Sequence, residues 1–274
     1  MLDRIRALKP QKRRVEHQVG APFLAVEHLH VRYNGNIALE DVHFKLAGGE
    51  QVAVVGPNGA GKSTLFKTIA GVLPPTSGQI KLSGSEPHGH ICIAYLPQRS
   101  EVDWSFPVTV KDVVMMGRVG KIGFLRSPGP EDWQQVNEAM EIVHMTPFAG
   151  RQISELSGGQ QQRMFIAQAL AQEAELLMMD EPLSGLDTPS QDEVLRILEE
   201  LRKRRVTVMV ATHDLGQASS RFEMAMLLNH RLLGFGESKE VFTAENLRGA
   251  YGSHLQMVET ENGYLMVGDT CCDG

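Results

Sequence analysis

The chain has 274 residues, of which 42% are hydrophobic and 22% are charged. This is an ordinary globular composition, which excludes collagen-like, low-complexity and disordered proteins and leaves ample length for a buried core. With a formal net charge of −6, the chain has no general positive field that would attract nucleic acid, so we expect no nucleic acid as a ligand.

The apolar segments are short, and none approaches the ~20 residues that a helix needs to cross a bilayer. Residues 1–21 carry basic side chains with no apolar run behind them, so they are interpreted as a basic N-terminal tail and not as a secretory signal. Such a tail is either a solvated terminus or a contact for anionic lipid headgroups. The cysteines, Cys92, Cys271 and Cys272, show no disulfide or zinc spacing, which favours a reducing compartment.

The first hundred residues predict two kinds of strand. Residues 23–32 and 42–46 have the patterning of strands that bury one face. Residues 51–55 form a continuous apolar run, which is typical of a strand buried on both faces. A proline- and glycine-containing turn is expected at 74–78, and a further strand at 91–96.

The middle of the chain has a different hydrophobic pattern. Between about 99 and 165, apolar residues including Trp104 recur at helical spacing, so we expect a helical insertion there. Residues 176–179 and 206–211 then predict two more buried strands on either side of a charged helix at 188–204. Strands that alternate with helices imply an α/β fold with a mostly parallel sheet.

A phosphate-binding loop is predicted directly after the buried strand at 51–55, where the sequence fits G-x-x-x-x-G-K-[ST] and a helical pattern follows. Glycines let successive backbone N–H groups wrap a phosphate, and the helix N-terminus adds positive charge. We expect Lys62 to reach the β- and γ-phosphates of a nucleotide and the Ser63 hydroxyl to ligate Mg²⁺. The predicted loop comprises Gly56, Pro57, Asn58, Gly59, Ala60, Gly61, Lys62, Ser63 and Thr64.

Four further polar residues stand at the ends of predicted strands. Ligand sites of parallel sheets lie at the carboxyl ends of their strands, so we expect Asp180 beside the loop as a Mg²⁺ ligand. Glu181 would lie beyond it as the catalytic base or the residue that positions water. His213 is expected to donate to charge that develops on the γ-phosphate, and Gln98 offers its amide oxygen to Mg²⁺ or to the attacking water.

A second glycine motif opens a predicted helix far along the chain from the first. Its serine is a good N-cap, and its glycines allow the backbone to approach an anion closely. One nucleotide needs one phosphate loop, so the economical arrangement is a head-to-tail dimer in which this motif covers the nucleotide of the other subunit. The residues expected to make this contact are Ser157, Gly158, Gly159 and Gln160.

In combination, these motifs resemble the ATP-binding cassette (ABC) ATPases over about residues 22–250. The resemblance implies a P-loop NTPase core with an N-terminal antiparallel β subdomain and a helical insertion at about 99–165. It implies ATP and Mg²⁺ as cofactors, and hydrolysis of ATP because both Glu181 and His213 are present. The matching segments are Gly56–Thr64 with Walker A, Met178–Asp180 with Walker B, Leu156–Gln160 with the signature, Ser184–Asp187 with the D-loop, Gln98 with the Q-loop and His213 with the H-loop.

Three positions depend on the resemblance alone. Tyr33 is similar in place to the aromatic residue that stacks on adenine, which we expect in preference to the alternative of a tyrosine that packs within its strand. Asp187 belongs to the segment that resembles the D-loop and is assigned to the nucleotide site. Gln168 departs from the family, which commonly has arginine there, so the local contacts of the signature helix are in question.

A single acidic cassette without spanning segments resembles the separate ATPase subunit of a bacterial importer. The resemblance implies a second ATPase subunit in a homodimer, a permease that docks near 99–118, and indirectly a substrate-binding protein. The chain would then lie peripherally on the cytoplasmic face of the membrane. The sequence of residues 102–126 is similar to that of the corresponding segment in ATPases of manganese, zinc or iron importers. The alternatives are an exporter or a soluble ABC ATPase without a membrane partner.

Two remaining features receive no function. His88-Gly89-His90 is interpreted as a surface turn, because third and fourth metal ligands are not evident. Residues 225–267 predict further short strands and a helix, and residues 251–274 form a C-terminal extension whose Cys271–Cys272 pair is interpreted as part of a frayed tail.

Overall fold

The computed structural model describes residues 21–33, 35–85, 92–123, 126–252, 255–260 and 263–268. No helix within these ranges is both long and apolar enough to cross a membrane. The predictions for the basic N-terminal tail, for His88-Gly89-His90 and for Cys271–Cys272 fall outside the described residues.

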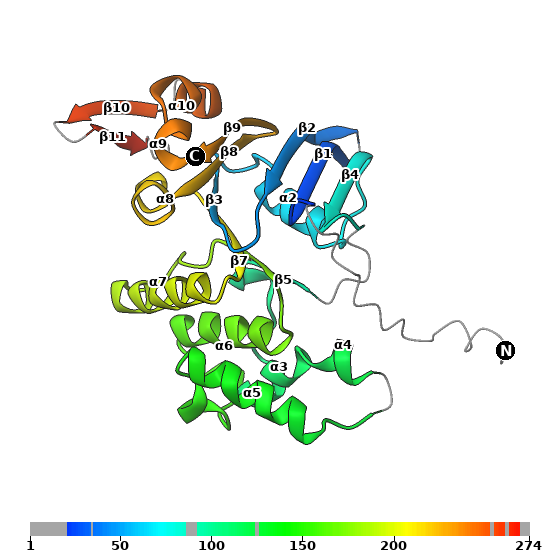
Figure 1. Cartoon of the computed structure of the whole chain (residues 1–274). Helices are drawn as coiled ribbons and strands as arrows, with labels where there is room; N and C mark the ends of the chain where they lie inside the picture. The colour runs from blue at the N-terminus through cyan, green and yellow to red at the C-terminus, as the bar shows by residue number, and fades with distance from the viewer. Residues whose placement is uncertain are drawn as a thin grey trace.

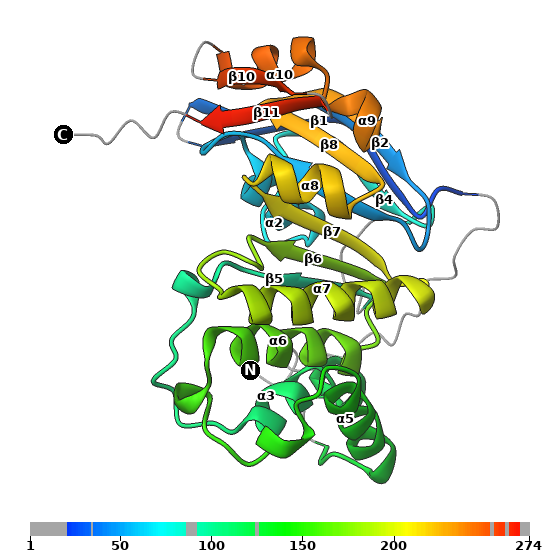
Figure 2. The same ribbon diagram turned by 90° about the vertical axis from the view of Figure 1, so that its left-hand side faces the viewer.

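A six-stranded sheet runs through the centre of the molecule (Figures 1 and 2). Its order is β5-β6-β7-β3-β8-β9, with the first five strands parallel and β9 antiparallel to β8. The predicted, mostly parallel α/β core is therefore confirmed. The strands are β3 (Gln51–Val55), β5 (Ile93–Leu96), β6 (Leu176–Asp180), β7 (Thr207–Thr212), β8 (Met224–Asn229) and β9 (Arg231–Glu237).

The central strands bury both faces, and successive residues of each strand enter different cores. In β3, Val52 and Val54 pack with the core that includes the antiparallel sheet, whereas Ala53 and Val55 pack with the core that includes the large helices. Strand side chains alternate between faces, so a strand between two cores needs apolar residues at every position. This is why the sequence shows continuous apolar runs here and alternation in the outer strands.

An antiparallel sheet of order β2-β1-β4 covers one face of the molecule, and the helix α2 (Lys62–Ile69) shares its core. Its strands are β1 (Leu24–Tyr33), β2 (Asn36–Leu46) and β4 (Ser77–Leu82). The turn predicted at 74–78 is too long, because β4 already begins at Ser77. Gly78 has φ 92°, and a Cβ there would overlap the carbonyl oxygen of His28. Glycine at this position therefore allows β4 to approach β1 closely.

The predicted helical insertion is present and lies at the opposite end of the molecule from the antiparallel sheet (Figure 1). Its third helix begins with Pro130 at a position where proline costs no hydrogen bond. The first and last of its long helices begin with reciprocal caps, Thr109 with Asp112 and Ser157 with Gln160. The helices are α3 (Val110–Met116), α4 (Val119–Ile122), α5 (Pro130–Ile142) and α6 (Gly158–Ala171), with 3₁₀ turns η2 (Arg99–Glu101), η3 (Thr146–Phe148) and η4 (Ile153–Glu155).

Beyond the insertion the chain returns to the central sheet. The single helix expected between 225 and 267 is in fact two short helices, because Thr243 accepts a hydrogen bond from the Asn246 N–H and starts a second one. The remaining elements are α7 (Thr188–Lys203), α8 (Leu215–Arg221), α9 (Ser238–Val241), α10 (Ala244–Tyr251), β10 (Leu255–Thr260) and β11 (Gly263–Gly268).

A buried arginine connects three parts of the helical insertion. The Arg118 guanidinium lies 3.0 Å from carboxylate oxygens of both Asp132 and Glu173, and it donates to the Ala171 carbonyl oxygen at 3.0 Å. Its side chain is only 5% exposed. Glu173 also pairs with Lys121 and Asp132 also accepts from the Gly129 N–H, so loss of Arg118 would weaken these contacts and leave the Ala171 carbonyl group without its donor.

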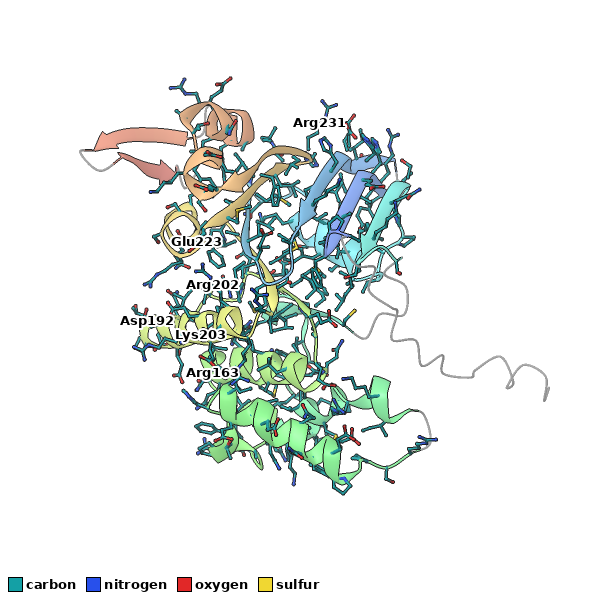
Figure 3. The ribbon with its side chains drawn as sticks, in the orientation of Figure 1. Arg163, Asp192, Arg202, Lys203, Glu223 and Arg231 are labelled. Atoms are coloured by element: carbon teal, nitrogen blue, oxygen red, sulfur yellow. The ribbon has the colours of Figure 1, made fainter. Side chains whose placement is uncertain are left out.

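We expect Arg118→Ala to lower the free energy of unfolding by about 2–4 kcal/mol, since it strips partners from Asp132, Glu173 and a buried carbonyl group. Denaturation by urea measures this change. The matched control is Arg202→Ala, which removes an exposed ion pair with Glu223 (Figure 3) and should cost less than about 0.5 kcal/mol. Equal losses in both variants would contradict a structural role of the buried arginine.

Candidate functional site

A cleft of about 820 Å³ lies at the carboxyl ends of the central strands, within the size range of small-molecule sites. It brings together twelve of the predicted site residues from four separate segments of the chain. These residues are Pro57, Asn58, Gly59, Ala60, Gly61, Lys62, Ser63, Thr64, Gln98, Asp180, Glu181 and His213.

The loop between β3 and α2 is held by close backbone contacts on two sides. A Cβ on Gly56 would overlap the carbonyl oxygen of Leu228 at the end of β8. Gly61 has φ 97°, and a Cβ there would lie 2.6 Å from the carbonyl oxygen of Ala38 on β2. Glycine at both positions therefore allows the loop to fit between β2 and β8.

Lys62 points back into this loop. Its ammonium donates to the carbonyl oxygens of Gly56 at 2.7 Å and Pro57 at 3.0 Å. Burial lowers the pKa of Lys62 from its ordinary value, while attraction to Glu181 and Asp180 acts in the opposite direction. The loop thus holds a buried cation beside inward-facing backbone, an arrangement suited to a phosphate group.

Two predicted catalytic side chains contact each other across the ends of β6 and β7. Nδ1 of His213 lies 2.9 Å from both carboxylate oxygens of Glu181. A carboxylate only accepts hydrogen bonds, so Nδ1 carries the proton in this contact. Glu181 has φ 50°, an uncommon conformation for glutamate that is fixed by its N–H bond to the Ala211 carbonyl oxygen. Strain of this kind is common at functional sites.

The second glycine motif lies outside the cleft, at the N-terminus of α6. Ser157 is exposed and caps the helix, and its own N–H donates to Oε1 of Gln160 at 2.9 Å. A Cβ on Gly159 would lie 2.6 Å from Oγ of Ser190 on α7, so this glycine allows the two helices to pack closely. None of the residues Ser157–Gln160 lines the cleft that contains the phosphate loop.

Three other predicted site residues lie apart from the cleft lining. Gly56 does not line the cleft and contacts the backbone of Leu228 at the end of β8. Tyr33 ends β1 with 42% of its surface exposed and does not line the cleft. Asp187 is the exposed N-cap residue of α7. The structure therefore brings the phosphate loop and the catalytic side chains together but leaves Tyr33 and Asp187 on the surface.

Arg99 is a residue that the motif pattern missed. It follows Gln98 directly, and its guanidinium donates to Oε1 of Gln161 on α6 at 2.8 and 3.2 Å. Trp104 donates from Nε1 to the Arg99 carbonyl oxygen at 3.1 Å, and its ring packs on Phe165 at 5.5 Å between centroids. These contacts fasten the segment after Gln98 to the helix that begins with the second glycine motif. The adjacency of Arg99 to Gln98 was the only sequence signal for it.

Tyr251, at the end of α10, also lines the cleft without any sequence signal. Its hydroxyl group is buried without a hydrogen-bond partner among the described residues. Burial raises the pKa of Tyr251 to about 12, so the phenol stays protonated at neutral pH. Beside it, Asn229 of β8 donates to the Ala250 carbonyl oxygen at 2.9 Å, which holds the end of α10 next to β8.

The fold and this set of motifs define a P-loop ATPase of the cassette class. Residues 39–184, just over half of the chain, match the ABC transporter family. The chain belongs to this family, so it is an ATP-binding protein and an ATPase.

Relatives agree with this assignment over most of the chain. The chelated iron transport system membrane protein YfeB of Yersinia pestis is 44% identical and covers 86% of this chain and 81% of its own. The manganese transport system ATP-binding protein MntB of Bacillus subtilis is 42% identical, with 85% and 94% covered. The structure of a metal-chelate type ABC transporter in an inward-facing conformation superimposes with a TM-score of 0.78 at 32% identity, covering 91% of this chain and 99% of that one.

We expect Lys62→Ala to weaken ATP binding about a hundredfold, because it removes charge-assisted hydrogen bonds to phosphate worth about 1.5–3 kcal/mol each. Titration with a fluorescent ATP analogue measures the change. Lys67→Ala is the control, since Lys67 lies in the last turn of the same helix, away from the cleft. Unchanged affinity in Lys62→Ala would refute the phosphate site.

Proposed function

We propose that the chain is the ATP-hydrolysing subunit of an importer for a divalent transition metal such as manganese, zinc or iron. Residues 22–250 form its ATPase domain, with the helical subdomain at about 99–165, and 251–274 form a C-terminal extension. The observation that carries the proposal is the single cleft that gathers the phosphate loop, two acidic residues, Gln98 and His213. The names of the two relatives, which concern chelated iron and manganese, support a metal cargo.

The residues of the cleft fit Mg²⁺ together with ATP. Ser63, Gln98 and Asp180 line the same cleft, and their side chains carry oxygen atoms, the ligands that hard Mg²⁺ prefers. When bound there, the ion offsets negative charge on the β- and γ-phosphates. Lys62 and the N–H groups of the loop hold the phosphates, and Tyr33 stacks on adenine.

Glu181 and His213 act on the attacking water and the γ-phosphate. Glu181 orients the water or takes its proton, and the contact with Nδ1 of His213 keeps the carboxylate turned into the cleft. His213 stabilises charge that develops on the phosphate during the reaction. Gln98 completes the site as a ligand of Mg²⁺ or a partner of the water.

Two chains form a homodimer in which each signature motif covers the ATP of the other subunit. Support comes from the place of the motif within one chain: Ser157 is exposed at the start of α6, and none of Ser157–Gln160 lines the chain's own cleft. The helix N-terminus there suits an anion, which the partner's γ-phosphate supplies. Asp187 of the D-loop contributes to the same interface. A head-to-tail pair satisfies both motifs at once and creates two equivalent sites.

The permease docks on the helical insertion near residues 99–118. Phe106 and Met116 are 57% and 45% exposed in this segment, and Val119 beside it is 58% exposed. Exposed apolar side chains that gather on one subdomain suit a helix of a membrane partner. Trp104, in the same segment, is partly buried and packs on Phe165 of α6. The chain then lies on the cytoplasmic face of the membrane, peripherally, and a separate binding protein delivers the metal to the permease.

Glu181→Gln tests the mechanism. We expect less than about 1% of wild-type phosphate release, because the amide cannot accept the proton of the water, while Mg-ATP still binds and holds a dimer. Phosphate release and size-exclusion chromatography with ATP give the two readouts. The matched control is Glu223→Gln, which changes an exposed carboxylate paired with Arg202 and should keep full activity.

Normal turnover in Glu181→Gln would remove the catalytic role of this residue. A variant that binds ATP but elutes as a monomer would contradict the dimer while leaving the nucleotide site intact. The two outcomes therefore separate chemistry from assembly.

Metal uptake tests the cargo. In a strain that lacks this gene, the wild-type chain should restore accumulation of radioactive Mn²⁺, Zn²⁺ or Fe²⁺, and Glu181→Gln should restore none of it. The variant is the control because we expect it to fold and bind ATP without supplying the energy of hydrolysis. Restored efflux of metal would indicate an exporter, and no change with any of the three ions would refute a metal cargo.

A further inference from the structure

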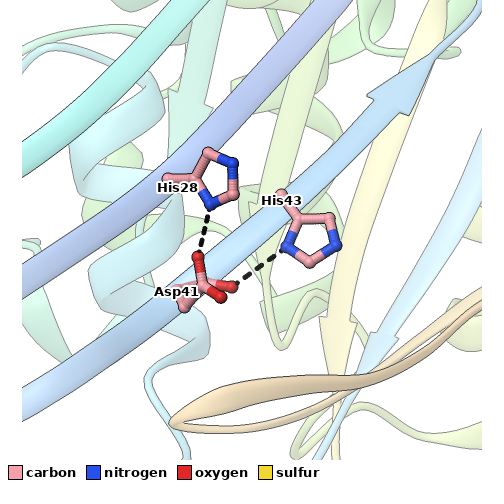
Figure 4. A group of neighbouring side chains, drawn as sticks. All are labelled: His28, Asp41 and His43. Carbon is pink, nitrogen blue, oxygen red and sulfur yellow. Dashed lines mark hydrogen bonds and ion pairs between the residues drawn. The ribbon is translucent and has the colours of Figure 1, made fainter.

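Three side chains that no step of ATP hydrolysis uses meet on the exposed face of the antiparallel sheet: His28 of β1 with Asp41 and His43 of β2 (Figure 4). Nδ1 of His28 lies 2.7 Å from Oδ1 of Asp41, and Nδ1 of His43 lies 3.2 Å from the Asp41 carbonyl oxygen. One nitrogen of each imidazole and one carboxylate oxygen all lie within 4.8 Å of one another. None of the three residues lines the nucleotide cleft.

A β-bulge in each of β1 and β2 brings these three side chains together. Between the pairs Val26–Phe44 and Leu29–Val42, β1 advances three residues while β2 advances two, so β1 holds one extra residue around His28. Between Leu29–Val42 and Val31–Leu39 the extra residue is on β2, around Asp41. A bulge re-aims the side chains beside it. Asp41 and His43 share a face because they are two residues apart in a strand.

Both bulged residues adopt a conformation that is uncommon outside glycine, with φ 49° at His28 and 50° at Asp41. Ordinary turn chemistry at such positions uses glycine or asparagine. At His28, β4 comes so close to the carbonyl oxygen that only glycine fits at position 78. The sheet therefore presents an imidazole and a carboxylate at two adjacent strained positions, with a second imidazole next to them.

We propose that His28, Asp41 and His43 form a binding site for a divalent transition-metal ion on the surface of the ATPase subunit. Two imidazoles and a carboxylate are ligands that Zn²⁺, Mn²⁺ and Fe²⁺ accept, and the open side of the site leaves room for water ligands. Zinc bonds of about 2.0–2.2 Å place tetrahedral ligands about 3.4 Å apart. Small rotations of these exposed side chains reach that separation, and the ion replaces the hydrogen bond between His28 and Asp41.

The site is distinct from the cleft but connected to it by one strand. Ala38, which lines the cleft, is three residues before Asp41 on β2. Between them, Glu40 donates its N–H to the His230 carbonyl oxygen at 2.8 Å and pairs with Arg231. The proposal does not depend on the cargo of the transporter, because binding of metal to the isolated chain tests it without transport.

Equilibrium dialysis of the full chain with Zn²⁺ alone, without nucleotide, tests the site. We expect Asp41→Asn and His43→Ala each to lose one molar equivalent of bound Zn²⁺ relative to wild type. Asparagine tolerates the positive φ of Asp41 but lacks the carboxylate charge, and His43 has ordinary strand geometry, so neither change disturbs the bulges. Because the readout is a difference, zinc bound elsewhere on the chain cancels.

The matched control is His144→Asn. His144 also has a positive φ and lies 3.3 Å from a carboxylate oxygen of Glu193, but the described residues provide no third ligand there. This variant should keep the full equivalent of Zn²⁺. A melting temperature that rises with Zn²⁺ in the wild type and in His144→Asn, but not in Asp41→Asn, is the second expected result, since a ligand of the native state stabilises it.

Wild type that binds no more Zn²⁺ than Asp41→Asn and His43→Ala would overturn the proposal. An equal loss in His144→Asn would also overturn it, because an isolated histidine–carboxylate pair would then suffice. Circular dichroism and retained ATP binding confirm that each variant is folded.

Discussion

The rest of the molecule depends on the burial of both faces of its central strands. Residues of β3, β6 and β7 alternate between two cores, one shared with the antiparallel sheet and one shared with the large helices. This places the three strands side by side and parallel, with β3 next to β7 and β7 next to β6. Their carboxyl ends therefore lie along one edge, where Gly56, Asp180 and Thr212 end the apolar runs and the polar chemistry begins.

The same constraint explains how much of the site could be predicted from sequence. Asp180 is the last residue of β6, and the phosphate loop, Glu181, Gln98 and His213 each follow a strand within a few residues. A buried apolar run therefore marks where a functional residue is expected. Parallel pairing then brings these residues into one cleft without any knowledge of the loops. The fold class followed from the alternation of strands and helices for the same reason.

What the sequence could not predict are contacts between distant segments. Tyr251 reaches the cleft because α10 packs beside β8, and no local pattern records that packing. The early start of β4 depends on Gly78 meeting the backbone of His28, which a turn-like composition conceals. The bulges of β1 and β2 belong to this class as well, since an extra residue is visible only once two strands are paired.

Arg99 is a further contact of this kind, and it joins two segments of the proposed site. In the proposed dimer, Gln98 faces the nucleotide of its own subunit, while the N-terminus of α6 faces the nucleotide of the partner. Arg99 joins the two, because it follows Gln98 and its guanidinium lies against Gly158 and Gln161. The contact is short and partly buried, so a shift of Gln98 must either move α6 or break these hydrogen bonds. If the proposed dimer forms, these bonds within each chain link its two clefts, and they also join the segment after Gln98 to the helical insertion through α6.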